Sequence, residues 1–190
     1  MRFLPCFWLS PAAPLTLCFE SRGGPALRIP KIGTRVGLDL RPVDVRSEDE
    51  RLWMLAQHNP ESRDVHDVLV KAFETITTVP IDFRAGDALD ILPAAIASSE
   101  GPLCIFHSAC VCYWRDEAKV RHETLLLKAS HRREIWRASM EPDLEKAAQT
   151  GSSPSTVLVD NIVTRYENGV ADPKVVFHAT ADNATFTWLD

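Results

Sequence analysis

The sequence has no tract in which positive charge is concentrated. Its 21 Lys and Arg residues are outnumbered by 26 Asp and Glu residues, for a formal net charge of -5, and they are scattered along the chain. Nucleic acids and anionic membranes both attract proteins through clustered Lys and Arg. We therefore expect neither a nucleic acid nor a membrane among the partners of this protein.

Long apolar runs and a disulfide framework are also missing. No run of about 20 residues escapes Pro or charged residues, so no transmembrane helix is expected. Residues 1–19 have one Arg before a mostly apolar stretch, as a secretory signal does, but Pro5, Pro11 and Pro14 interrupt it. The five Cys are an odd number without the spacing of a disulfide scaffold, so we expect reduced thiols in a cytoplasmic protein.

Two common kinds of reactive site have no signature in this chain. Cys104, Cys110 and Cys112 alternate along one predicted strand, but no second Cys or His pair has the spacing of a zinc site. We therefore expect no metal. A nucleophilic serine is equally unsupported, because the sequence contains no G-x-S-x-G element.

The composition is that of an ordinary globular protein. With 45% hydrophobic and 25% charged residues, the 190-residue chain is long enough to bury a sizeable core. It has no internal repeat and no low-complexity tract. We expect a single α/β domain over residues 1–190, with residues 1–14 as an irregular N-terminal segment.

The most informative stretch is residues 86–114, which predicts a turn, a helix and a strand in that order. Asp87 can cap the helix, and Leu103–Tyr113 is a nearly unbroken apolar run without Pro or Gly. Such runs are typical of strands buried on both faces of a parallel sheet. Ligands of parallel sheets bind outside the carboxyl ends of the strands, where Asp87, His107 and Ser108 would lie.

The flanking sequence alternates between helix and strand patterns. Ser47 and Glu50 have the spacing of a capping box, in which each side chain binds the other residue's backbone N–H at the start of a helix. Apolar residues at helical spacing predict a second helix that includes residues 65–76. The remaining predictions are strands at 35–45, 134–140, 156–166 and 174–189, a helix at 116–129, a loop at 145–155 and a turn at 168–169.

This order of elements predicts an α/β fold. Strands that alternate with helices, followed by a terminal run of strands, indicate a doubly wound, mostly parallel sheet with an antiparallel C-terminal edge. Trp53, Trp136 and Trp188 lie at the centres of predicted elements, where aromatic side chains mainly bury area, so we expect them in the core.

Each candidate side chain also has a structural interpretation. Asp87 is a helix N-cap on any reading, and Asp39 and Asp44 lie in a predicted turn, where acids often bind their own backbone. His107 can act as a base near neutral pH, but the sequence identifies no acid that orients it, so a strand-end histidine is the alternative. Glu141 follows the strand at 134–140 and would line the same edge of the sheet.

Several segments together are similar to a known family. They are RVGLDLRPVDVRSEDERLW at 35–53, GDALDILP at 86–93, CIFHSACVCYW at 104–114 and the terminal TWLD, and they resemble the domain-of-unknown-function family 2332. The resemblance covers about Leu15 to Asp190. Members of that family look like S-adenosylmethionine-dependent methyltransferases in architecture, so the resemblance implies a Rossmann-like sheet of seven strands with a reversed hairpin at its end.

The resemblance also implies a role for four residues. Asp39 would bind the ribose of the cofactor S-adenosylmethionine, and Asp87 would face its adenine. His107 and Ser108 would lie beside the transferred methyl group, with His107 as the catalytic group that positions or deprotonates a small-molecule acceptor. The methyl acceptor and the oligomeric state are not implied.

The chain departs from the family pattern at one important place. Family members have an upstream strand and a glycine-rich turn, E-x-G-x-x-x-G-L-N-L, that this sequence does not contain. We therefore expect the first strand of the sheet to be missing and the binding of S-adenosylmethionine to be weak or absent. The second hypothesis is a noncatalytic interaction or scaffold protein, or a shortened and inactive family member.

Overall fold

The computed structural model describes residues 6–8, 16–18, 20–22, 31–150, 158–180 and 185–189. Helices and strands alternate along much of this chain, so the mixed α/β class is confirmed. Contacts divide the chain into two compact units, here called the large unit, mainly residues 93–190, and the small unit, mainly residues 29–92. Each is described by itself, and the single-domain expectation stays a prediction.

The large unit contains a six-stranded mixed sheet, in which three of the five strand pairs are antiparallel. The predicted mostly parallel sheet is therefore not what this unit contains, although the β6–β7 and β3–β10 pairs are parallel. Across the sheet the strands are β3 (Glu20–Arg22), β10 (Thr185–Trp188), β9 (Val170–Thr180), β8 (Leu158–Glu167), β7 (Ile135–Pro142) and β6 (Leu103–Ser108).

A two-residue turn explains the antiparallel pairing of β8 and β9, as the sequence predicted. Asn168 and Gly169 both have positive φ, 51° and 77°, which is the conformation of a tight hairpin whose twist matches the strands. Ser130 at the end of α4 (Asp116–Ser130) holds this turn, because its carbonyl accepts from Asn168 N at 3.1 Å and its hydroxyl from Gly169 N at 2.9 Å.

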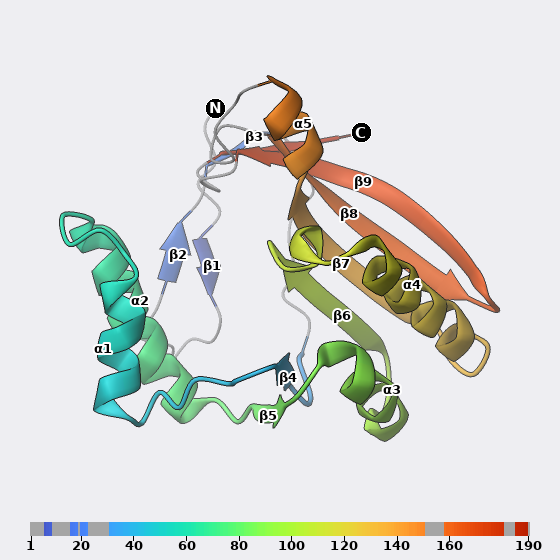
Figure 1. The fold of residues 1–190 in the computed structure, drawn as a ribbon, viewed down its shortest axis with the longest axis horizontal. Helices are drawn as coiled ribbons and strands as arrows, with labels where there is room; N and C mark the ends of the chain where they lie inside the picture. The colour runs from blue at the N-terminus through green and yellow to red at the C-terminus, as the bar shows by residue number, and fades with distance from the viewer. Residues whose placement is uncertain are drawn as a thin grey trace. The chain divides into compact units, whose positions relative to one another are not determined.

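Helix α4 packs against one face of the sheet, over β7, β8 and β9 (Figure 1). Leu126 of the helix and Ile135 and Tyr166 of the sheet are fully buried, at 0% exposure. Burial of large side chains of this kind is the main favourable term in folding. The core of the large unit therefore lies between α4 and the central strands.

In the small unit, β4 (Val36–Asp39) pairs in parallel with β5 (Asp82–Ala85). Two helices, α1 (Glu48–Ala56) and α2 (Arg63–Thr78), connect these strands and pack against each other. A further antiparallel pair is formed by β1 (Cys6–Trp8) and β2 (Thr16–Cys18). The predicted second helix is thus confirmed, and Phe73 on its apolar side is buried.

The capping box predicted at the start of α1 is only half correct. The Ser47 hydroxyl accepts a hydrogen bond from Glu50 N at 3.4 Å, as predicted. The Glu50 carboxylate, however, accepts from Asp44 N at 2.6 Å rather than from Ser47 N, which donates to Asp44 O. The backbone turn at 44–47 satisfies Ser47 N, so Glu50 is free to hold the turn instead.

Helix α3 (Ala88–Ser98) runs across the boundary of the two units. At its N-terminus Asp87 Oδ1 accepts from Leu89 N at 2.8 Å, which confirms the predicted cap. At its C-terminal end the Arg133 guanidinium donates to Ile96 O at 3.4 Å, and beyond that end it donates to the carbonyls of Ser99, at 2.6 Å, and of Gly101. Both ends of the helix therefore have partners for backbone groups that the helix itself leaves unpaired.

The strand predicted over Leu103–Tyr113 ends early, at Ser108. Ala109 has a positive φ of 46°, and residues 111–113 form a short 3-10 helix. Cys104 is therefore the only one of the three clustered cysteines in the strand. Phe106 is 69% exposed, so β6 is not buried on both faces as predicted.

Two further predictions are wrong. The loop predicted over 145–155 is partly helix, because α5 spans Leu144–Thr150; residues 151–155 lie outside the described part of the chain. Trp53, predicted in the core, is 62% exposed, and Trp136 is 38% exposed.

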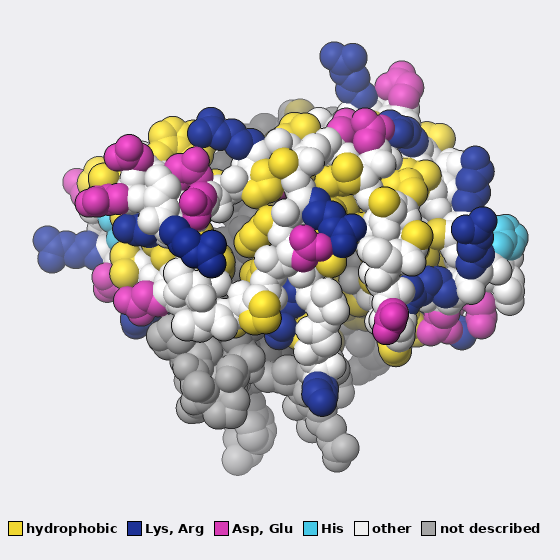
Figure 2. Space-filling view, turned by 90° about the horizontal axis from the view of Figure 1, so that it is seen from below, with side chains coloured by type: hydrophobic (Ala, Val, Ile, Leu, Met, Phe, Trp, Pro, Cys, Tyr) yellow, Lys and Arg dark blue, Asp and Glu magenta, His cyan; other side chains and the backbone are white. Residues whose placement is uncertain are grey.

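Figure 2 shows one face of the protein, on which hydrophobic side chains lie between basic and acidic ones. Among the described residues, no helix combines the length and the apolar character that are needed to span a bilayer.

Candidate functional site

Two acidic residues lie at the carboxyl ends of the parallel strands of the small unit. The register pairs Asp39, the last residue of β4, with Ala85, the last residue of β5. Gly86 N donates to Asp39 O at 2.9 Å, and Asp87 follows directly. Gly86 has a φ of 143°, which L side chains rarely adopt, so glycine permits this turn. The structure thus brings Asp39 and Asp87 to the same sheet edge.

In each of these carboxylates, one oxygen accepts a hydrogen bond from the backbone amide two residues later in the chain. Asp39 Oδ1 accepts from Arg41 N at 2.7 Å, and Asp87 Oδ1 accepts from Leu89 N at 2.8 Å. Both residues are exposed, and the Oδ2 atoms make no hydrogen bond to any part of the chain that the structure describes. One acceptor oxygen on each side chain is therefore available to a ligand. Asp44 Oδ1 likewise accepts from Arg46 N at 3.0 Å, but Asp44 lies in the turn before α1 and not at the end of a strand.

In the large unit, His107 and Ser108 end β6 beside the end of β7. The register pairs Ser108 with Met140, so the next residue along β7, Glu141, lies beyond the end of β6. Glu141 Oε1 lies 2.6 Å from His107 Nδ1, and the two side chains are 19% and 13% exposed. The sequence did not pair this acid with His107, although the position of Glu141 directly after the strand predicted at 134–140 placed it at the same edge of the sheet.

The Glu141 carboxylate has further partners in the loop that follows β6. Cys110 N and Cys112 N each donate to Glu141 Oε2 at 3.0 Å. Burial works to raise the pKa of Glu141, but the hydrogen bonds from His107 and from Cys112 prevail and lower it from 4.5 to about 2. Glu141 is therefore ionised at neutral pH.

A second histidine packs against the first. The His122 ring of α4 lies edge-on to the His107 ring and to the Trp114 ring, with 5.6 Å between centroids in both cases. His122 is 5% exposed, and burial, followed by the charges of His107 and Arg137, lowers its pKa from 6.5 to about 4. His107 Nε2, in turn, is buried and has no hydrogen-bond partner among the described residues.

The four predicted site residues thus form two pairs. Asp39 and Asp87 share an edge in the small unit, and His107 and Ser108 share one in the large unit. Both edges are carboxyl ends of parallel strands, and the sequence predicted these four residues at such ends.

Comparison with known proteins places the chain in a family. The family model described as "Uncharacterized protein conserved in bacteria (DUF2332)" matches residues 8–188. The chain belongs to this family. No curated protein and no solved structure matches it. The resemblance seen in the sequence is therefore confirmed for the family itself, and the description of the family contains no activity.

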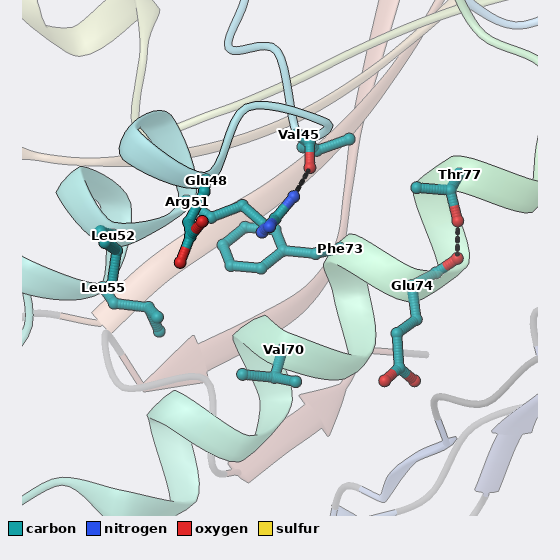
Figure 3. A pocket seen from close by; sticks show the side chains of 9 residues that line it. All are labelled: Val45, Glu48, Arg51, Leu52, Leu55, Val70, Phe73, Glu74 and Thr77. Carbon is teal, nitrogen blue, oxygen red and sulfur yellow. Dashed lines mark hydrogen bonds between the residues drawn. The ribbon is translucent and has the colours of Figure 1, made fainter.

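This family member also has a cavity of about 390 Å³ between α1 and α2 (Figure 3). Arg51 crosses one side of it and donates to Val45 O at 2.8 Å. The other lining residues are Glu48, Leu52, Leu55, Val70, Phe73, Glu74 and Thr77. Neither Asp39 nor Asp87 lines this cavity, so it is separate from the predicted site.

The cysteines of this family member do not form an obvious reactive centre. Burial, followed by a hydrogen bond to Glu141 and its charge, raises the pKa of Cys112 to about 11, so its thiol is protonated at neutral pH. Within the described ranges, no three His, Cys, Asp or Glu side chains are arranged to bind a metal ion.

Proposed function

We propose that this protein binds a nucleoside ligand of the S-adenosylmethionine type at the carboxyl ends of β4 and β5. The observation that carries the proposal is the position of Asp39 and Asp87 at adjacent ends of two parallel strands. Ligands of α/β sheets bind at such ends, and a carboxylate there commonly accepts hydrogen bonds from the hydroxyl groups of a ribose.

The residues at this edge fit such a ligand. Asp39 and Asp87 each have one oxygen without a partner among the described residues, and Gly86 between them has no side chain that would block the approach. Asp39 would accept from the ribose hydroxyls, and Asp87 would accept from an amino group of the base. When bound, S-adenosylmethionine supplies an electrophilic methyl group.

We expect this binding to be weak. Cofactors of this kind are usually cradled by a glycine-rich turn that follows a strand and opens a helix. The pair Gly33 and Gly37 does not form one, because Gly37 lies inside β4. Two carboxylates without such a turn provide orientation but little of the contact area that tight binding needs.

A role for the second pair is proposed separately. His107 would accept a proton through Nε2, because its Nδ1 faces the Glu141 carboxylate. Ser108 is half-buried at the same strand end and would contribute a hydroxyl to the ligand. Since Nε2 is buried, the methyl-accepting substrate can reach it only when the side chains that cover it move.

A thermal melt of the full chain with excess S-adenosylmethionine, and with its demethylated product, tests the proposal. A ligand that binds only the folded state raises the melting temperature. Asp39→Asn and Asp87→Asn should abolish the rise, and Asn at residue 87 still caps α3, so loss of the helix does not explain the result. Asp67→Asn, on the exposed side of α2, is the matched control and should keep the rise. No rise in a cooperatively melting wild-type chain would contradict the proposal.

One observation favours the second candidate function, a noncatalytic interaction protein. The helices α1 and α2 expose four apolar side chains, Leu52, Trp53, Val68 and Val70, at 55%, 62%, 40% and 44%. Exposed apolar groups of this size are often found at protein interfaces. Sedimentation of the purified chain would show self-association that Trp53→Ser weakens, whereas a monomer at all concentrations would count against pairing through this surface.

A further inference from the structure

We propose that Glu141 is a positioning residue, whose carboxylate fixes both the imidazole of His107 and the turn formed by residues 110–112. The positioning matters for activity only if His107 accepts a proton as described above, and in this respect it rests on the proposed function. The positioning itself does not depend on any ligand, so the two ideas can fail separately.

The contacts of Glu141 carry the proposal. One carboxylate oxygen lies 2.6 Å from His107 Nδ1, and the other accepts from Cys110 N and Cys112 N, both at 3.0 Å. A carboxylate only accepts hydrogen bonds, so Nδ1 must carry the proton of the shared bond. The bond therefore selects one tautomer and one orientation of the ring, in which Nε2 is buried without a hydrogen-bond partner among the described residues.

The loop after β6 contains a residue in an unfavourable backbone conformation, which additional hydrogen bonds can stabilise. Ala109 has a φ of 46°, a conformation that is unfavourable for a residue with a side chain. Ala109 N donates to Met140 O at 3.0 Å, and two of the next three amides along the loop, those of Cys110 and Cys112, donate to Glu141. The Glu141 charge offsets the strain by satisfying two backbone N–H groups at once, and this holds the loop over the ends of β6 and β7.

The first test uses the unaltered protein. In the full chain with ¹⁵N-labelled histidine, long-range proton–nitrogen NMR spectra report which ring nitrogen carries a proton, and His107→Gln identifies the His107 signals. We expect a proton on Nδ1 of His107 at pH 8. A His107 with bare Nδ1 and a proton on Nε2 would overturn the proposal, and this measurement needs no variant of Glu141.

The second test follows the loop through its backbone amides. Glu141→Gln keeps the size of the side chain but replaces the charged acceptor of Cys110 N and Cys112 N with a neutral one. Hydrogen exchange of the Cys110 and Cys112 amides, measured by NMR, should be about tenfold faster in Glu141→Gln, because hydrogen bonds to a charged group are the stronger ones. The amide of Cys104 in β6 is the internal reference, whose exchange rate should not change.

Glu134→Gln is the matched control. Glu134 lies just before β7, at its other end, and accepts from Arg165 and Trp136, so its loss alters an ion pair without touching the loop. The Cys112 amide should exchange at the wild-type rate in this variant. An unchanged Cys112 exchange rate in a folded Glu141→Gln protein would refute the proposal, and if that variant does not fold, the tautomer of His107 in the wild type decides. If the wild-type protein shows the expected His107 tautomer and loop behaviour but no thermal shift with S-adenosylmethionine, only the proposed function is refuted.

Discussion

Nδ1 of His107 lies 2.6 Å from Oε1 of Glu141, and this contact joins the carboxyl ends of two neighbouring parallel strands. The residues are 34 positions apart in sequence, and the parallel register of β6 and β7 places them together. Both side chains are mostly buried, so water weakens their attraction little. Through the amides of Cys110 and Cys112, the same carboxylate links the histidine to the loop that follows β6.

Mild acid should destabilise the protein through His122. Its pKa is about 4 in the folded state and 6.5 ordinarily, so between these values the unfolded chain binds more protons and stability falls as the pH falls. We expect a loss of about 2 kcal/mol between pH 7 and pH 5 in urea denaturation. His122→Gln should flatten this dependence, and a variant of the exposed His58, His58→Gln, should not. An equally steep loss in His122→Gln would show that other groups cause it.

Glu141 acts in a lower range of pH. Its pKa is about 2 in the folded state and 4.5 ordinarily, so the stability it contributes is present above pH 4.5 and is lost as the pH falls through 2. Glu141→Gln should therefore remove part of the stability at neutral pH and also part of the further loss below pH 4.5. Urea denaturation at pH 5 and pH 3 measures both, and equal losses in variant and wild type would contradict the prediction.

Tyr166→Phe should destabilise the large unit. The buried Tyr166 hydroxyl donates to Glu123 Oε2 at 3.0 Å, and the same oxygen accepts from Arg137 at 2.7 Å. Removing the donor costs about 1 kcal/mol because the ring still fills its place in the core. Tyr113→Phe is the matched control, because Tyr113 is 68% exposed. This variant should unfold at the same urea concentration as the wild type. Equal stability of the two variants would mean that this hydroxyl contributes nothing.

Gly169→Ala should weaken the β8–β9 hairpin. The residue has a φ of 77°, where a side chain costs about 1–2 kcal/mol. An added Cβ would also lie 2.5 Å from the His131 ring, which must move away. Gly33→Ala is the control, because an added Cβ there meets nothing within 4 Å and its φ is not positive. Thermal melts of both variants check the prediction, and a Gly169→Ala protein as stable as the wild type would contradict it.

Asp87→Ala should separate helix capping from ligand binding. Loss of the carboxylate leaves Leu89 N unpaired and costs about 1 kcal/mol of stability, whereas Asp87→Asn keeps the cap. The ligand-free melting temperature should therefore fall in Asp87→Ala and stay close to wild type in Asp87→Asn. If both variants melt like the wild type, the cap is not a source of stability.

Sequence periodicity and short-range signals predicted the local structure well. The helical spacing of apolar residues gave α2, Ser47 and Asp87 mark the first turns of α1 and α3, and Asn168-Gly169 forms the hairpin turn. In each case the deciding interaction lies within a few residues of the signal, because caps and tight turns are closed by neighbouring backbone groups.

Sequence patterns were less informative where a segment must choose among distant partners. The apolar run 103–113 was predicted as one strand, but it turns after Ser108, because the amides of Cys110 and Cys112 bind Glu141 instead of a neighbouring strand. Trp53 was predicted to be buried, yet apolar character alone does not say which face of α1 meets another element.

By itself, the sequence determined the family, the mixed α/β class and the position of Asp39, Asp87, His107 and Ser108 at strand ends, because composition and spacing are local properties. Their division into two pairs came from the structure. The tertiary structure alone decided that the large sheet is mostly antiparallel and that Glu141 holds His107. Both depend on the register between strands that are far apart in the chain. Register is set by the packing of whole elements, and no single stretch of sequence contains it.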